Sequence, residues 1–283
     1  MKKVTLTGLL ICKCSLWLVA QTASGIFEKN TMQYKGDKQT QVKRLLKKVS
    51  LWGKVSANDA SIDQAFLQLL NSPIEPSKAQ LQKYIQANNI TTQETGGNIN
   101  NGISFIVLNG QKIYARYFVI HDVSSPVYKD SFPKNINEAS WPFNNASKWN
   151  SKKTHTYVTR TGACNTVTDF SEGLRATKFE LNTLGTASRG LFIHIELVQP
   201  RKYPPGNNAN APAAPQPGFT DIQYVKLALL YVCAGVRKGE WLVPAFHAVV
   251  DEGLNDGHDD PQNFEVDKFT NAVLKLIADI KAF

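Results

Sequence analysis

Apolar residues at helical spacing mark the first third of the chain. Between residues 40 and 49 four of them recur at positions i, i+3, i+4 and i+7, which predicts an amphipathic helix. These four are Val42, Leu45, Leu46 and Val49. Two further apolar segments, Ile62–Leu70 and Ser77–Ile90, predict two more helices. Residues 26–95 are therefore expected to form a small helical N-terminal region.

The other side of the first predicted helix is basic. It carries Lys43, Arg44, Lys47 and Lys48. Such a face could touch an anionic surface, but a solvated side of an amphipathic helix is the better interpretation.

After residues 91–102, which we interpret as a linker or a long turn, the pattern becomes that of strands. Ile103–Leu108 and Ile113–Val119 flank Asn109-Gly110, a sequence typical of a tight hairpin. Thr154–Arg160 and Gly190–Val198 predict two further strands.

The last third of the chain returns to helical spacing. Residues 199–218 are rich in proline and predict a long surface loop or insertion. Thr220 then caps a predicted helix that runs to about Val236, and a short apolar run precedes a last helix over Glu265–Lys281. The order of strands and helices predicts an α/β domain with helices packed on a central mixed β-sheet.

Composition and charge narrow the class of protein. The chain has 283 residues, of which 42% are hydrophobic, and its formal net charge is +9. This much apolar material can bury a sizeable core. The positive charge indicates an anionic partner such as a nucleic acid, a membrane surface or an acidic cell-wall polymer. No basic-aromatic motif of a nucleic-acid-binding protein is present, so we expect no nucleic acid partner.

The N-terminus resembles a signal peptide over residues 1–25. Lys2 and Lys3 precede an apolar stretch from Leu9 to Val19, and small residues follow. Lys13 interrupts the stretch, which makes a stable membrane span a poor interpretation. We therefore expect a periplasmic or secreted protein, whose net charge would fall from +9 to +6 when three lysines leave with the leader.

The leader leaves two questions open. Cleavage could follow Ala20, Ala23 or Gly25. A lipoprotein is disfavoured because Cys12 and Cys14 lack a small residue before them. In an oxidising compartment the remaining Cys164 and Cys233 could form a disulfide, or they could be two separate buried thiols.

Glu196 is the first candidate for chemistry. It lies in the apolar run Gly190–Val198, whose period of two places Phe192, His194 and Glu196 on one face. A buried carboxylate costs free energy unless it is paired or lies near a metal, and such groups cluster at active sites. A structural glutamate bonded to backbone or arginine is the alternative.

Two histidines and an acidic run are the second candidate. His121 and His247 each end a short apolar run, and Asp259–Pro261 follows His247 after a glycine-containing loop. Two imidazoles and one carboxylate are a donor set typical of catalytic zinc, which keeps its fourth position for water. On spacing alone, the acidic run could equally be a solvated loop.

Five segments resemble, in the same order, zinc N-acetylmuramoyl-L-alanine amidases, the family that includes phage lysozyme-type amidases and peptidoglycan recognition proteins. They are Tyr117–His121, Thr154–Gly162, Leu191–Val198, Thr220–Tyr224 and the stretch from Pro244 to Pro261. The resemblance covers about residues 105–283, with 199–218 as an insertion, and gives a zinc amidase domain over 103–283. It does not cover the N-terminal region.

The resemblance implies an α/β fold with zinc in a surface groove. It implies hydrolysis of the amide between N-acetylmuramic acid and L-alanine in peptidoglycan, the partner that a basic chain would suit. By position, His121, His247 and Asp260 correspond to the zinc ligands, and Glu196 to the acid that assists the attacking water. His258 corresponds to the group that stabilises the oxyanion.

The chain departs from the family pattern at the last motif. His258 replaces the usual lysine, Gln262 replaces a common glycine, and Asp259 is an alternative to its neighbour as the third ligand. His155 and His194 are interpreted as structural. Since histidine is charged over only part of the pH range, we expect activity to fall above neutral pH.

Two other functions remain open. One is a peptidoglycan-binding module on the same fold without catalysis, which the missing lysine allows. The other is a zinc peptidase that cuts within the stem peptide, because the same chemistry serves any amide. The N-terminal region could dock on the wall, bind a regulator or occlude the groove.

Overall fold

A five-stranded mixed sheet forms the centre of the molecule. The computed structural model describes residues 22–203 and 212–283. The strands lie in the order β11 (Val243–Phe246), β5 (Tyr117–Asp122), β9 (Phe192–Leu197), β7 (Thr156–Val158) and β8 (Cys164–Thr166). The first four are parallel and β8 is antiparallel to β7. The expected α/β fold with a central mixed sheet is confirmed.

The two central strands are apolar because both faces of the sheet are covered. All residues of β5 are buried, and β9 is buried apart from a partly exposed Glu196. In the parallel register His121 pairs with Glu196, and Phe246 pairs with Ile120. The carboxyl ends of β11, β5 and β9 therefore meet at one edge of the sheet, where ligands of open α/β sheets usually bind.

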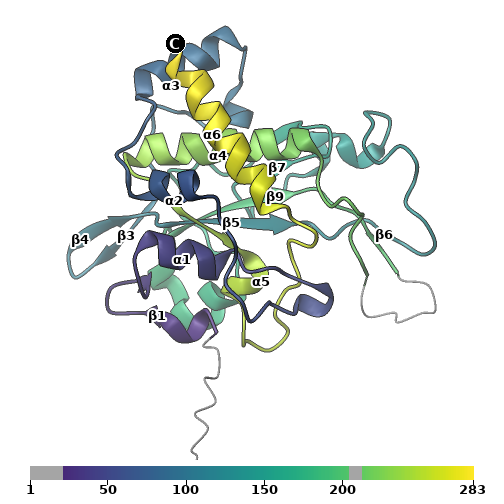
Figure 1. Cartoon of the computed structure of the whole chain (residues 1–283), viewed down its shortest axis with the longest axis horizontal. Helices are drawn as coiled ribbons and strands as arrows, with labels where there is room; N and C mark the ends of the chain where they lie inside the picture. Colours follow the sequence, from purple (N-terminus) through teal and green to yellow (C-terminus); the bar gives the residue numbers. More distant parts are fainter. Residues whose placement is uncertain (1–21, 204–211) are drawn as a thin grey trace, which may run out of the picture.

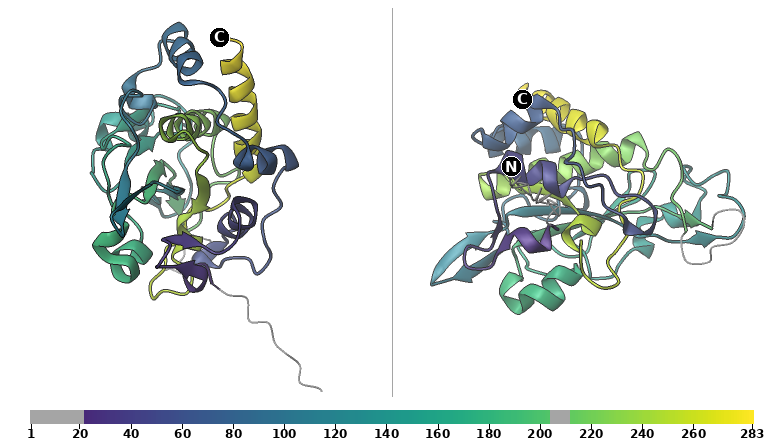
Figure 2. Two further views of the ribbon diagram at one scale, coloured as in Figure 1. Left: turned by 90° about the vertical axis from the view of Figure 1, so that its left-hand side faces the viewer. Right: turned by 60° about the horizontal axis from the view of Figure 1, so that its bottom comes forward.

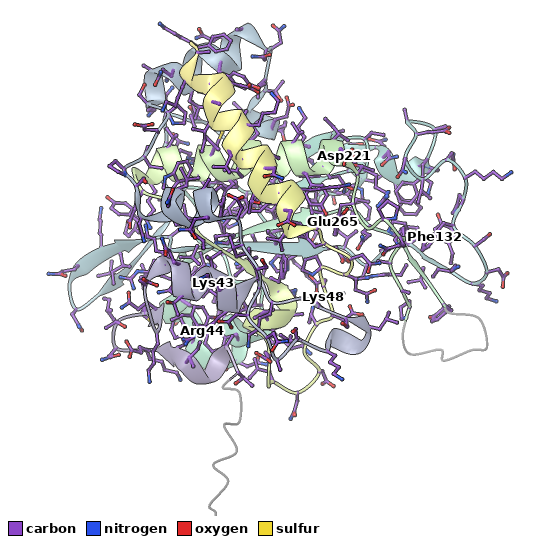
Figure 3. The ribbon with its side chains drawn as sticks, viewed as in Figure 1. Lys43, Arg44, Lys48, Phe132, Asp221 and Glu265 are labelled. Carbon is purple, nitrogen blue, oxygen red and sulfur yellow. The ribbon has the colours of Figure 1, made fainter. Side chains whose placement is uncertain are left out.

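Long helices cover one face of the sheet. In Figure 1, α4 (Asp221–Lys238) and α6 (Val266–Lys281) lie above it, and α1 (Lys38–Leu45) lies below. The Thr220 side chain caps α4 and forms a capping box with Gln223, as its sequence predicts. Asp221 and Glu265 lie at the starts of the two long helices (Figure 3), and Lys268 bridges them at 3.0 and 3.2 Å.

The N-terminal region is helical, as expected, and shares the core of the sheet domain. It contains α1, α2 (Gln64–Asn71) and α3 (Lys78–Ala87). The Phe66 ring lies 6.0 Å from the rings of both Tyr231 on α4 and Phe269 on α6. Residues 26–95 therefore pack as a layer on the sheet domain.

The basic side of α1 differs from the prediction in one residue. Lys43 and Arg44 are half-buried and Lys48 is exposed (Figure 3), but Lys47 is only 6% exposed. The helix ends at Leu45, so the side chains beyond it no longer follow the helical face.

The predicted strand Ile113–Val119 is wrong, because the chain divides there into two strands. β3 (Phe105–Leu108) and β4 (Gln111–Tyr114) form a separate hairpin that projects from the body (Figure 2), and β5 begins at Tyr117. Between them the Arg116 guanidinium donates to the carbonyls of Thr31 and Met32, which redirects the chain into the central sheet.

Residues 91–102 form a long turn held against the sheet domain. The Arg237 guanidinium on α4 donates to the carbonyl of Gly96 at 2.8 Å and to that of Gly102. Of the two interpretations of this segment, linker or long turn, the second is confirmed.

The remaining strands and the remaining α-helix are short. They are β1 (Phe27–Glu28), β2 (Gln33–Tyr34), β6 (Val127–Tyr128), β10 (Arg201–Lys202) and α5 (His247–Val250). β10 pairs with β6 at the start of the proline-rich insertion. Residues 204–211 of that insertion lie outside the described residues, as do residues 1–21 of the expected signal peptide.

Residues at the end of the expected leader belong to the core. Ala23 is 3% exposed and Ile26 is 5% exposed. Of the three possible cleavage points, the one after Ala20 therefore leaves the core whole. Within the described ranges, none of the helices combines the length and apolar character needed to cross a bilayer. Cys164 and Cys233 are free thiols, so they form no disulfide with each other.

Candidate metal centre

Three predicted ligands meet at the carboxyl edge of the sheet. Nδ1 of His121, at the end of β5, lies 2.9 Å from Nδ1 of His247, the first residue of α5. The Asp260 carboxylate approaches Nδ1 of His247 at 3.1 Å and Nδ1 of His121 at 3.8 Å. All three side chains are buried. Segments 139 residues apart in sequence thus bring two imidazoles and a carboxylate to one point.

The spacing of these donor atoms fits a metal ion. Tetrahedral zinc with bonds of about 2.0–2.2 Å places its ligand atoms roughly 3.3–3.6 Å apart. With Oδ2 of Asp260 as the third ligand atom, the three separations are 2.9, 3.2 and 3.8 Å and bracket that value. The trio His121, His247 and Asp260 can therefore hold a metal ion.

Asp260 faces the imidazoles and its neighbour does not. Oδ2 of Asp260 accepts a hydrogen bond of 3.1 Å from the backbone N–H of Asp122, which fixes the carboxylate. Asp259 is partly exposed, accepts from Nε2 of Gln262 at 2.6 Å and lies 3.6 Å from Arg201. Of the two aspartates that the sequence left open, the geometry selects Asp260.

Glu196 lies beside the trio with one oxygen free. Its Oε1 is 3.9 Å from Nδ1 of His121, and Oε2 is buried without a hydrogen-bond partner among the described residues. Burial, followed by the nearby Asp260 carboxylate, raises the pKa of Glu196 to about 8. A carboxyl group in this state can take up and release a proton near neutral pH.

His258 lies at the mouth of the site. Its ring centroid is 4.0 Å from that of His247, and its Nδ1 is 3.6 Å from Oδ1 of Asp260. The side chain is 45% exposed, so one edge of the ring is open to solvent. Such a group can reach a bound molecule as well as the Asp260 carboxylate.

The trio opens into a groove of about 760 Å³. Its lining includes Ser124, Lys153, Ala176, Glu196, Asp256 and His258. None of the lining residues belongs to 26–95, so the described part of the N-terminal region does not occlude the groove. The volume suits a mid-sized ligand of the kind that clefts usually bind.

In both imidazoles the second ring nitrogen, Nε2, also lies near a polar side chain. Nε2 of His121 lies 3.0 Å from Nδ1 of His194, and Nε2 of His247 lies 3.0 Å from Oδ2 of Asp251. Burial would lower the pKa of His247, but Asp260 and Asp251 raise it to about 10. Burial, followed by His247 and His194, lowers the pKa of His121 well below its usual value.

The two histidines interpreted as structural, His155 and His194, have different neighbours. Nε2 of His155 lies 3.1 Å from the Glu172 carbonyl, and its Nδ1 accepts from the backbone N–H of His194. The His194 side chain instead contacts His121 directly, because Glu196 and His194 share one face of β9 next to β5.

A buried ion pair supports the site from behind. Nη2 of Arg201 donates to both carboxylate oxygens of Asp122 at 2.8 Å, and both side chains are fully buried. Asp122 also accepts from the backbone N–H of Gln262 at 3.2 Å, which ties the chain after Asp260 to β5.

The sequence analysis did not predict a role for Asp251, Arg201 or Asp122. Asp251 carries a usable signal, since it lies at i+4 from His247 and such residues share a helix face. Arg201 and Asp122 carry none, because they are 79 positions apart and meet only through the sheet.

Comparisons of the chain with protein-family models, with curated proteins and with solved structures each found no match.

Proposed function

We propose that the protein is a zinc-dependent amidase that hydrolyses the bond between N-acetylmuramic acid and L-alanine in peptidoglycan. The observation that carries the proposal is the meeting of His121, His247 and Asp260 beside Glu196 at the inner end of a groove. These are the residues that the resemblance to zinc N-acetylmuramoyl-L-alanine amidases selects. The mixed central sheet is compatible with the fold of that family.

The donor set favours zinc over harder cations. Imidazole suits zinc and other transition metals, whereas magnesium and calcium prefer oxygen ligands. His121 and His247 would bind through Nδ1 and Asp260 through its carboxylate. Zinc in such a site acts as a Lewis acid and lowers the pKa of bound water to about 7.

Glu196 supplies the proton transfer. Its unpartnered Oε2 is the atom that would accept a proton from the attacking water and pass it to the leaving amine of L-alanine. Because the side chain is mostly buried, competing protons and bulk water have little access to it.

His258 would bind the oxyanion. Its partly exposed ring lies over His247 at the mouth of the site, where a protonated Nε2 could donate to a negative oxygen of the substrate. The same position in related amidases usually holds a lysine, so the interaction here would depend on pH.

Charge and the N-terminal sequence favour peptidoglycan as the substrate. The leader-like residues 1–25 suit a protein that works in the periplasm or outside the cell. A chain with net charge +9, or +6 without the leader, is attracted to a polymer rich in carboxylates. Lys153, in the groove lining, is a basic group near the site.

The bond that is cut decides among the candidate functions. Purified muropeptides with an intact stem should be incubated with the protein, and the products identified by mass spectrometry. Free muramic acid carboxyl groups and whole stem peptides with an L-alanine amine are expected. A cut within the stem would replace the proposal by a zinc peptidase, and tight binding without any cut would replace it by a binding module.

A further inference from the structure

A chain of buried side chains leads away from His121. Its Nε2 lies 3.0 Å from Nδ1 of His194, and Nε2 of His194 lies 3.1 Å from Oε2 of Glu180. The side chains of His194 and Glu180 are fully buried. Glu180 belongs to η6 (Phe179–Leu184), which is remote from β5 in sequence and precedes β9.

This chain fixes which nitrogen of each ring carries the proton. A carboxylate can only accept, so its oxygen 3.1 Å from Nε2 of His194 favours the proton on that nitrogen, although the pair lacks the geometry of a hydrogen bond. Nδ1 of His194 is then an acceptor, and Nε2 of His121 must donate to it. Nδ1 of His121 is left with a free lone pair, directed at His247 and Asp260, which is the form that a metal ligand requires.

Glu180 is itself held as an acceptor by the segment just before it. Its Oε2 accepts from the backbone N–H groups of Ala176 at 3.2 Å and Thr177 at 3.1 Å, and from the Thr177 hydroxyl at 3.0 Å. Three donors converging on one oxygen hold the carboxylate in place.

The same segment holds the partner of the second imidazole. Asp251 accepts from the backbone N–H groups of Lys178 at 3.1 Å and Phe179 at 2.8 Å. Its Oδ2 lies 3.0 Å from Nε2 of His247, and Nδ1 of the same ring faces Asp260. Five consecutive residues, 176–180, thus anchor the carboxylates behind both imidazoles.

We propose that the segment 176–180 is the positioning element of the metal centre. Through Glu180 and His194 it sets the tautomer of His121, and through Asp251 it sets the orientation of the His247 ring. His121 is thereby preset to bind a metal through Nδ1, and His247 presents its Nδ1 to the same point. The inference rests on the proposed metal site but not on the identity of the substrate.

The test compares two buried histidines of the same cluster. The His194 and His155 rings stack with centroids 5.9 Å apart, but only His194 contacts a ligand. We expect His194→Phe to weaken Zn²⁺ binding about 10–100-fold, the usual effect of removing a group that orients a ligand. His155→Phe, the matched control, should change it by less than about threefold. Affinity is measured by competition with a chelating indicator.

The possible outcomes distinguish the proposed metal centre from the proposed positioning role of 176–180. If the unmodified protein fails to bind Zn²⁺, the metal centre itself is wrong. If it binds Zn²⁺ and His194→Phe binds equally well, the metal centre stands and the positioning role is refuted.

A measurement on the unmodified protein covers the case in which His194→Phe does not fold. Nitrogen-15 NMR of the zinc-loaded protein, labelled in its histidines, should show Nε2 protonated and Nδ1 coordinated in both His121 and His247. Coordination through Nε2 in either ring would overturn the inference.

Discussion

At the scale of single residues, the site combines buried groups that are hydrogen-bonded with buried groups that are not. Asp260 is held by a backbone N–H, whereas Oε2 of Glu196 and Nε2 of His247 are buried without a hydrogen-bond partner among the described residues, the latter 3.0 Å from Asp251. A buried polar atom without a partner costs about 1–3 kcal/mol, so a functional reason for it is expected.

Replacing Glu196 should separate catalysis from metal binding. We expect Glu196→Gln to lower kcat about 10²–10⁴-fold, since the amide cannot transfer the proton. Zn²⁺ affinity should change little because Glu196 is not one of the three donors. Hydrolysis rates and indicator competition on the same preparation check this. Unchanged kcat would remove Glu196 from the mechanism.

The residue at position 258 should set the upper limit of the pH range in which the protein is active. Histidine as a residue type is charged over a narrower pH range than lysine, so the two residues at this position should give different pH profiles. We expect kcat/KM to fall above neutral pH, and His258→Lys to keep it nearly constant up to about pH 9. A flat profile for the unmodified protein over that range would contradict the role of His258.

At the scale of elements, a turn of the N-terminal region braces the loop that carries His258 and Asp260. The turn Leu51–Gly53 ends at Gly53, whose φ is +65°. A Cβ at Gly53 would lie 2.6 Å from the carbonyl oxygen of His258. Residues 26–95 thus reach the metal centre by shaping its loop and not by entering the groove.

A side chain at position 53 should displace the loop that carries His258 and Asp260. We expect Gly53→Ala to lower kcat/KM about 10–100-fold, since a shift of roughly 1 Å in a site has that effect. Gly110→Ala is the matched control, because Gly110 has a φ of +79° and open space around it at the hairpin tip. Both variants pay a similar backbone cost of about 1–2 kcal/mol, visible in Tm. Equal activity in the two variants would refute the bracing contact.

The sequence predicted elements where one periodicity runs without interruption. The strand Gly190–Val198 and the helices capped at Thr220 and ending at Lys281 appear with ends shifted by one or two residues. The division between β4 and β5 was not predictable from the sequence. It depends on a hydrogen bond from Arg116 to the carbonyl of Thr31, which lies 85 positions earlier in the chain. The ligands came from short motifs, whereas Glu180 lies in the short π-helix η6, whose sequence carries no such motif.

At the scale of the whole molecule, two layers of helix share one sheet. Figure 1 shows α2 and α3 beside α6, and contacts such as Phe66 with Phe269 join them. Val42, Leu45 and Leu81 are fully buried in the same core cluster. The N-terminal region, whose role the sequence left open, is therefore part of the scaffold.

Removing that region should prevent folding. A chain that begins at residue 96 would expose the apolar faces now covered by α1 and α2, a patch that favours aggregation. We expect it to be insoluble or to lack a cooperative thermal transition, whereas a chain beginning at residue 22 should unfold cooperatively. The two chains are compared by circular dichroism and size-exclusion chromatography. A stable monomer from residue 96 would show that the sheet domain folds alone.

The most direct test of a zinc amidase is the dependence of peptidoglycan cleavage on the metal. Purified peptidoglycan should be digested by the protein as isolated, after treatment with a chelator, and after return of Zn²⁺. The account predicts release of stem peptides with a free L-alanine amine, loss of that release with the chelator, and recovery with Zn²⁺. Release that continues without metal, or no release under any of the three conditions, would contradict it.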